Sequence, residues 1–410
     1  MRDGASSVRH PRRFLAVTGI AAFGAAVLLG VAGGVLAAVM ARRIVTPSVT
    51  RADDVRIYSV DLAAGRIILQ STADSVLAGD YSFWFSADRG HAHLGEILRL
   101  TPSTVTRRIL RVDHGDLARA ERGRLGGYSY LGPWDLGLAF EDVLIPTGAG
   151  DAPAWLIPAA EPHGRWVILV LGRGVQRLET LRAAPVFRDA GVTSLLVSYR
   201  NDGEAPKSED GRYALGDAEW QDVDAAIAFA VHRGATEIVL MGWSMGGAIV
   251  LQAATRSPLR DRIVGIVLDS PVIDWADVAR FHGGLLGLPA VVAIGALEVL
   301  GRRWGGIFTG QTAPIDFRRL DFVTRAAELK LPVLLMHSDD DGFVPATGSR
   351  ALAGRRPDIV TFLPFAVARH TKLWNYDREG WNQAITNWLG GIAPIGRTSL
   401  PDRPGEVAAS

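Results

Sequence analysis

The chain carries Gly242-Trp243-Ser244-Met245-Gly246-Gly247 between an apolar run, 237–241, and a helix-forming segment, 248–254. The apolar run predicts a buried parallel strand, and the Gly-x-Ser-x-Gly pattern after it predicts a sharp turn into a helix. The corner residue of such a turn has a strained backbone, and side chains larger than those of the flanking glycines would collide there. The stretch therefore predicts a nucleophilic hydroxyl on Ser244 at the end of a strand.

Two backbone amides are expected beside this serine to stabilise a negatively charged oxygen. The N–H of Met245 would stand at the N-terminus of the predicted helix, where amides lack an intrahelical acceptor. A second amide is expected from Leu171-Gly172-Arg173-Gly174-Val175, which follows the apolar strand 166–171. We assign this role to the N–H of Arg173, with that of Gly174 as the alternative, while an ordinary strand-to-helix turn is the competing interpretation.

A serine hydroxyl needs a base to take its proton, usually a histidine oriented by a carboxylate. In the chain order that accompanies a Gly-x-Ser-x-Gly elbow, the carboxylate follows the serine first and the histidine second. The histidines after Ser244 are His282, His337 and His370, and only His370 lies beyond Asp341. We therefore predict Asp341 as the acid and His370 as the base, in loops that follow two predicted strands.

Other side chains near these positions are alternatives. Asp339 and Asp340 share the turn with Asp341, and we expect them to bound the turn or cap a helix. Asp269 ends an earlier strand and is a second candidate for the acid. We expect His337 to be a ring packed at a strand end.

Composition describes a globular protein rather than a disordered one, since 48% of the 410 residues are hydrophobic and 21% are charged. This length allows two or three domains, or one large domain with additions. A net charge of +1 gives no broad basic field, so no nucleic-acid partner is expected. The absence of cysteine excludes disulfides, thiolate metal sites and a cysteine nucleophile.

The N-terminal segment, 1–45, is predicted to anchor the chain in a membrane. Residues 14–40 carry no charged side chain and are long enough to cross a bilayer as one helix. More arginines precede this span than follow it, which favours a single-pass anchor with the remainder of the chain extracytoplasmic. A cleaved signal peptide is the alternative, although its apolar core would be shorter, about 7–15 residues. Arg12-Arg13-Phe14-Leu15 also resembles a twin-arginine signal.

Residues 46–139 are predicted to form a strand-rich accessory region without assigned chemistry. Alternating or apolar runs of strand length occur at 55–60, 66–70, 81–85, 97–100 and 106–112. His91 and His93 have the i, i+2 spacing of a metal-binding pair, but no carboxylate or third histidine stands beside them in the sequence. We interpret them as part of a loop between strands.

Residues 140–392 are predicted to form an α/β domain. Apolar strand-length runs alternate there with helical segments, which predicts a mostly parallel sheet covered on both faces. Residues 272–328 interrupt the alternation and are interpreted as a helical lid insertion, with a plain packing insertion as the alternative. The tail, 393–410, is rich in Pro, Gly, Ser and Ala and is predicted to be disordered.

Over about residues 140–390 these motifs resemble the α/β-hydrolase superfamily, and in particular its dienelactone-hydrolase-like and serine-aminopeptidase-like branch. The stretch 242–247 matches the nucleophile elbow, and 337–345 resembles the family's H-G-x-x-D-x-x-V-P turn, with serine in place of the glycine. Ala368-Arg369-His370 resembles the approach to the catalytic histidine, and 199–203 resembles a Y-R-G-Y-G loop. The family often has His-Gly before the oxyanion residue, where this chain has Leu171-Gly172.

The resemblance implies a serine hydrolase that needs no metal or organic cofactor and acts on a small-molecule or lipid-like acyl substrate. A carboxylic ester is the favoured substrate, while a peptidase or amidase and an acyltransferase would use the same residues. Glu204, Glu209 and Asp210 would suit a peptidase pocket for a charged terminus. A non-catalytic binding or scaffold protein is the alternative from another class. The oligomeric state stays open.

Overall fold

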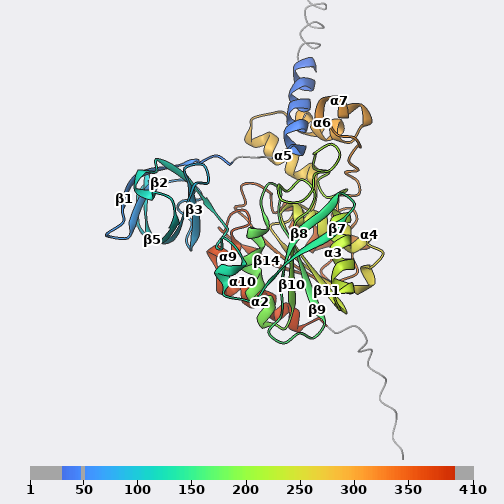
Figure 1. Cartoon of the computed structure of the whole chain (residues 1–410). Helices are drawn as coiled ribbons and strands as arrows, with labels where there is room; N and C mark the ends of the chain where they lie inside the picture. The colour runs from blue at the N-terminus through green and yellow to red at the C-terminus, as the bar shows by residue number, and fades with distance from the viewer. Residues whose placement is uncertain (1–29, 48–50, 393–410) are drawn as a thin grey trace, which may run out of the picture. The chain divides into compact units, whose positions relative to one another are not determined.

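The computed structural model describes residues 30–47 and 51–392 (Figure 1). These residues form two compact units. In the first, the described residues up to Val45 pack with Ala279–Ile315. The second comprises the described residues within Thr46–Val278 and within 316–392, and it holds both sheets that the described residues form. The tail expected at 393–410 lies outside the described residues.

The larger sheet has eight strands in the order β14-β13-β12-β11-β9-β10-β8-β7. Its strands are β7 (Glu141–Thr147), β8 (Gly150–Ile157), β9 (Arg165–Val170), β10 (Thr193–Val197), β11 (Glu237–Trp243), β12 (Ile263–Asp269), β13 (Val333–Ser338) and β14 (Val360–Phe365). The six strands from β9 to β14 pair in parallel, whereas β7 and β8 form an antiparallel pair at one edge. The predicted α/β architecture with a mostly parallel sheet is therefore confirmed.

Helices cover this sheet because its central strands are apolar on both faces. They are α2 (Ala184–Asp189), α3 (Trp220–His232), α4 (Met245–Arg256), α8 (Thr347–Arg355), α9 (Leu373–Tyr376) and α10 (Arg378–Gly390). Short 3-10 turns are η1 (Leu117–Arg119), η2 (Pro133–Leu136), η3 (Arg177–Ala183), η4 (Arg260–Arg262), η5 (Arg303–Gly305) and η6 (Ala326–Glu328). Helices α2 and α10 contact each other, and α3 contacts α4. These two pairs cover the central strands.

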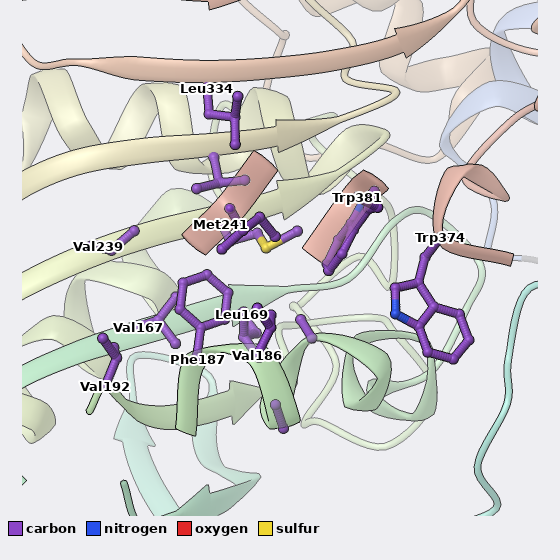
Figure 2. Close-up of a cluster of buried hydrophobic side chains, with 14 of the residues drawn as sticks. Val167, Leu169, Val186, Phe187, Val192, Val239, Met241, Leu334, Trp374 and Trp381 are labelled. Atoms are coloured by element: carbon purple, nitrogen blue, oxygen red, sulfur yellow. The ribbon is translucent and has the colours of Figure 1, made fainter. Parts of the chain in front are cut away.

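The core between the sheet and the α2–α10 pair follows the period of two that a strand imposes. Val167 and Leu169 of β9 lie beside Val239 and Met241 of β11, and all four side chains are fully buried. Figure 2 shows them beside Phe187 of α2 and Trp381 of α10. The alternate residues of these strands, such as Ile168 and Leu240, are also buried and face the opposite side, so the central strands are packed on both faces.

The second sheet is a closed antiparallel barrel with the strand order β1-β2-β5-β4-β3-β6. Its strands are β1 (Val55–Asp61), β2 (Arg66–Gln70), β3 (Tyr81–Phe85), β4 (Gly90–Leu100), β5 (Thr104–His114) and β6 (Arg122–Gly126). Alternate apolar side chains such as Phe83, Leu94 and Val105 fill its interior. His91 and His93 lie within β4, so their expected placement in a loop is wrong.

Arg182 of η3 joins the barrel to the larger sheet. Its Nη1 donates to the carbonyl of Gly127, directly after β6, at 3.1 Å and to that of Thr371 at 2.8 Å. The amide of Asn375 in α9 continues this connection, because its Nδ2 donates to the carbonyl of Asp80 at 2.8 Å. Buried polar contacts thus connect the barrel to the segment that follows His370.

The first unit contains a helix over residues 30–45, together with α6 (Ala290–Leu300), α7 (Gly306–Thr309) and the end of α5 (Trp275–Leu285). Among the described residues, none of the helices is both long and apolar enough to cross a membrane. The expected span begins at residue 14, and its part up to residue 29 lies outside the described residues. The helix continues past Met40 through Arg42 and Arg43, and Arg42 Nη1 donates to the carbonyl of Phe308 at 3.1 Å.

Candidate active site

Ser244 occupies the corner between β11 and α4. Its backbone is strained, with φ 51° and ψ −119°, a region that favours glycine. A Cβ on Gly242 would lie 2.3 Å from the carbonyl oxygen of Gly246, and one on Gly246 would lie 2.3 Å from that of Val170. Both flanking positions therefore admit only glycine without a shift of the backbone.

His370 lies in the loop between β14 and α9, where Arg369 and Thr371 on either side of it both have positive φ. Hydrogen bonds hold this loop, because the N–H of Thr371 donates to Ser270 Oγ at 3.1 Å. His370 Nε2 lies 3.0 Å from Ser244 Oγ, which is hydrogen-bond distance for transfer of the serine proton. The structure thus brings together two groups that lie 126 residues apart in the sequence.

Asp341 completes the row of contacts, because its Oδ2 lies 2.7 Å from His370 Nδ1. Its Oδ1 accepts hydrogen bonds from the backbone N–H groups of Phe343 and Val344, each at 2.8 Å. Burial opposes ionisation of this carboxyl, but the attraction of His370 and hydrogen bonds from His337 and His370 outweigh it and lower the pKa of Asp341. The group is therefore a carboxylate at neutral pH.

The two neighbouring aspartates have other partners. Asp339 pairs with Arg350 at the surface. Asp340 Oδ1 accepts from Ser338 Oγ at 2.7 Å and from the N–H of Arg369 at 2.9 Å, so it fixes the approach to His370. Only Asp341 of the three contacts the ring of His370 among the described contacts.

Asp269, the second candidate for the acid, lies beneath the serine corner. Its Oδ2 accepts from Trp381 Nε1 at 3.0 Å, and its Oδ1 accepts from Ser270 Oγ at 2.9 Å. Its backbone carbonyl accepts from the N–H of Ser244 at 3.1 Å. Burial raises the pKa of Asp269. These contacts make it a support for the corner and not a partner of His370.

His337 contacts the same carboxylate, which sequence reasoning missed. The ring is fully buried at the end of β13, as expected, and its Nε2 lies 3.2 Å from Asp341 Oδ2 and 3.0 Å from the carbonyl of Val344. Its Nδ1 lies 2.7 Å from Ser349 Oγ. Since Nε2 faces two acceptors, it carries the proton and donates to them. The i, i+4 spacing of His337 and Asp341 across one turn was the available signal.

The candidate oxyanion amides flank the serine. Met245 is the first residue of α4, so its N–H has no intrahelical acceptor. A Cβ on Gly172 would lie 3.2 Å from the Cβ of Ser244, which places the segment carrying Arg173 against the nucleophile. The N–H of Gly172 is already used, because it donates to Glu179 Oε2 at 3.1 Å.

Glu179 and Tyr199 hold the Gly172 peptide from both sides. The hydroxyl of Tyr199 donates to the carbonyl of Gly172 at 2.6 Å. On the other side, the N–H of Gly172 donates to Glu179. Both side chains are buried. Sequence reasoning did not identify Glu179, since nothing in its local pattern shows that its carboxylate turns back onto Gly172, seven residues earlier.

One group of side chains within the described residues has metal-ligand geometry, and it lies on the barrel. The ligand atoms of His91, His93 and Asp113 all lie within 4.8 Å of one another. Asp113 comes from β5, the neighbour of β4 in the sheet. Strand pairing thus supplies the carboxylate that the sequence did not show beside the two histidines.

Two family profiles match the chain. One, described as "Alpha/beta hydrolase family", matches residues 143–384. The other, described as "Domain of unknown function (DUF8805)", matches residues 56–126, which is the barrel. Among curated proteins, no sequence matches this chain significantly.

Solved structures share the fold at low sequence identity. An esterase of Pyrococcus furiosus has a TM-score of 0.51 at 18% identity, with 65% of this chain and 96% of that chain covered. Est1E of Butyrivibrio proteoclasticus, solved with ferulic acid bound, has a TM-score of 0.46 at 18% identity, covering 60% of this chain and 97% of that chain. The esterase RhEst1 of Rhodococcus has a TM-score of 0.43 at 17% identity, covering 62% of this chain and 99% of that chain. At these identities the likeness concerns the fold alone.

Proposed function

Because this chain belongs to the alpha/beta hydrolase family, we propose that it is a serine hydrolase that cleaves a carboxylic ester through Ser244, His370 and Asp341. The observation that carries the proposal is the row of contacts from Ser244 Oγ to His370 Nε2 at 3.0 Å and from His370 Nδ1 to Asp341 Oδ2 at 2.7 Å. A structural role for these residues would not need a strained backbone at the serine.

In this mechanism His370 Nε2 takes the hydroxyl proton as Ser244 Oγ attacks the acyl carbonyl. The resulting oxyanion receives hydrogen bonds from the N–H groups of Met245 and Arg173. His370 then donates its proton to the departing alkoxide, which leaves an acyl-serine. Water attacks the acyl-serine with His370 as base, and the acid product leaves. Asp341 orients the imidazole and stabilises its cation throughout.

An ester is favoured over an amide because an alkoxide needs less help from a proton donor to leave than an amine does. The peptidase alternative loses support at Glu204, which pairs with Arg177 at 2.9 Å. Asp210 also has hydrogen-bond partners within its own loop, since its Oδ1 accepts from Ser208 Oγ and from the N–H of Arg212. One solved structure with a TM-score of 0.51 is that of an esterase, which makes ester hydrolysis the first activity to test.

The proposal is tested with p-nitrophenyl esters of increasing acyl length, using the full chain and its Ser244→Ala variant. We expect hydrolysis by the parent and a loss of at least about 10³-fold in kcat for the variant. Equal rates for the two proteins would show that Ser244 is not the nucleophile. The preferred acyl length would then separate short-chain from lipid-like substrates.

We also propose that the first unit attaches the protein to a membrane, with the larger unit on the extracytoplasmic side. Support comes from the uncharged sequence 14–40 and from exposed apolar side chains on the described part of this unit. They are Val31, Val35, Leu36, Val39, Leu285, Leu286, Val291, Trp304, Ile307 and Phe308. Apolar surface of this kind marks a protein or membrane contact.

A further inference from the structure

Three side chains converge on the outer surface of the barrel, where β4 and β5 pair. His91 and His93 are two residues apart on β4 and therefore face the same side, while Ala92 and Leu94 between and beside them fill the interior. The pairing shifts between His91 and Ala92, so Asp113 has no direct partner on β4. Bulges of this kind re-aim a side chain, and here the carboxylate points at both imidazoles.

The hydrogen bonds of His91 leave a lone pair facing the carboxylate. Ser82 Oγ donates its proton to the carbonyl of Tyr128, because a carbonyl can only accept. Ser82 Oγ must then accept from His91 Nε2, which lies 2.8 Å away. A neutral His91 therefore has no proton on Nδ1, although Nδ1 lies 2.6 Å from Asp113 Oδ2.

His93 presents the same arrangement. The guanidinium Nη2 of Arg111 can only donate, and it lies 3.0 Å from His93 Nε2, so this nitrogen carries a lone pair. The same nitrogen lies 3.2 Å from Asp113 Oδ2. Two imidazole nitrogens with lone pairs and one carboxylate oxygen thus lie within 4.8 Å of one another. Such a set repels itself unless a cation or a proton lies between its members.

Protonation of His91 is the less favourable way to relieve this repulsion. The imidazole is fully buried against the ring of Trp84, with ring centroids 4.4 Å apart, and burial disfavours the charged form. A metal ion satisfies all three atoms at once.

We propose that His91 Nδ1, His93 Nε2 and Asp113 Oδ2 bind a divalent transition-metal ion, for which zinc is the best match. Two histidines and one carboxylate form a common zinc ligand set that leaves a fourth position open. Tetrahedral bonds of about 2.0–2.1 Å place ligand atoms about 3.3 Å apart. The three atoms need only small side-chain rotations to reach this spacing.

One neighbouring contact already resembles that of an outer ligand shell. The second nitrogen of His91, Nε2, is fixed by Ser82 Oγ at 2.8 Å. Fixed partners of this kind orient metal ligands and tune their affinity. The side chains of His93 and Asp113 are each 15% exposed, which gives a metal ion access from solvent.

Arg111 is the competing cation in this site. Its Nη2 donates to the lone pair on His93 Nε2, so a metal ion can bind there only after Arg111 Nη2 moves away. The side chain is 52% exposed, and Asp135 Oδ2 lies 3.9 Å from the same nitrogen and offers another partner. Removal of the Arg111 charge should therefore strengthen metal binding, whereas a purely structural cluster would be weakened by it.

The test uses the full chain without a histidine tag, stripped with a chelator and titrated with Co²⁺, whose visible absorption reports the coordination geometry. We expect one Co²⁺ per chain with a four-coordinate spectrum, displacement by Zn²⁺, and a higher unfolding temperature with metal. His93→Gln and Asp113→Asn should weaken binding by more than about 10-fold. Arg111→Gln should bind more tightly than the parent. His163→Gln, which changes an exposed histidine elsewhere, should bind as the parent does.

Two results would overturn the proposal. Unchanged affinity in His93→Gln and Asp113→Asn, with far-ultraviolet circular dichroism showing both folded, would place the metal elsewhere. Absence of binding in both the parent and Arg111→Gln would show that the cluster is a hydrogen-bond network alone. Neither result depends on ester hydrolysis, because the site shares no residue with Ser244, His370 or Asp341.

Discussion

The backbone conformation of Ser244 costs stability and positions its hydroxyl for reaction. Its φ of 51° and ψ of −119° hold the hydroxyl against His370, and a non-glycine residue there carries strain of about 1–3 kcal/mol. The glycines on either side were predictable because the elbow pattern is local. The contact of His337 with Asp341 was not predicted although the two residues are only four apart, because the sequence does not show that the turn folds back onto the ring. The clamp on Gly172 was not predicted either, because it joins Glu179 of η3 and Tyr199 beyond β10 to one loop.

Replacing Ser244 by glycine should relieve this strain, whereas alanine should retain it. Both variants lose the hydroxyl, so their difference isolates the backbone. We expect Ser244→Gly to be more stable than Ser244→Ala by about 1 kcal/mol, after the larger entropy of unfolded glycine is included. Urea unfolding of the two variants measures the difference. If Ser244→Ala were the more stable of the two, the backbone strain argued here would be absent.

The depressed pKa of Asp341 predicts a pH-dependent contribution to stability. A carboxyl with a folded pKa below its unfolded value of about 3.9 stabilises the native state fully above that value and loses the contribution as the pH falls below it. The advantage of the parent over Asp341→Asn should therefore be smaller by about 1 kcal/mol at pH 3 than at pH 7. Urea unfolding at the two pH values tests this. An advantage that stays constant or grows toward pH 3 would contradict it.

At the scale of elements, apolar runs predicted the strands of the parallel sheet well because buried parallel strands are continuous in hydrophobicity. The barrel strands β1, β2, β3 and β5 coincide with alternating or apolar segments of the sequence, whereas only residues 97–100 of β4 were predicted as strand. Strand β6, with Arg122-Gly123-Arg124-Leu125-Gly126, has little apolar content to reveal it. Closure of the barrel and the meeting of Asp113 with β4 depend on which strands pair. Period-two alternation carries no information on pairing.

Arg182 of η3 is the element-scale contact whose loss should matter most. Its guanidinium bonds the carbonyls of Gly127 and Thr371 and lies 3.8 Å from Glu179, in a fully buried position. Arg182→Met would leave the two carbonyls without a hydrogen-bond donor and Glu179 without the opposite charge. We therefore expect the free energy of unfolding to fall by about 3 kcal/mol.

The matched control is Arg188→Met in α2, whose side chain is 34% exposed and pairs only with the exposed Asp189 among the described contacts. Its effect should stay within about 0.5 kcal/mol. Chemical unfolding of both variants provides the measurement. Equal effects of the two substitutions would mean that Arg182 does not join the barrel to the loop after His370.

At the scale of the whole molecule, the chain combines a hydrolase-family sheet, a barrel and a helical unit with exposed apolar side chains. The described helix over 30–45 is the part of the expected anchor that the structure shows, and the residues before it carry the remainder of the uncharged sequence. Hydropathy gave the location of this segment. It gave no sign that the helix packs with Ala279–Ile315, since that contact joins distant parts of the sequence.

Membrane attachment predicts how the expressed protein partitions. We expect the full chain to stay in the membrane fraction after an alkaline carbonate wash, and a variant lacking residues 1–29 to be released by it, because the uncharged span is then lost. Fractionation with a soluble and a membrane marker measures this. A full chain that appears with the soluble marker would contradict the anchor.

The central claim is that Ser244 is an activated nucleophile, and labelling with a fluorophosphonate probe tests it most directly. The account predicts that the full chain is labelled, that Ser244→Ala and His370→Ala are not, and that Asp341→Asn is labelled far more slowly. Asp339→Asn, which changes the surface partner of Arg350 in the same turn, should be labelled at the parent rate. Labelling that persists in Ser244→Ala, or a folded parent that is not labelled at all, would contradict the account.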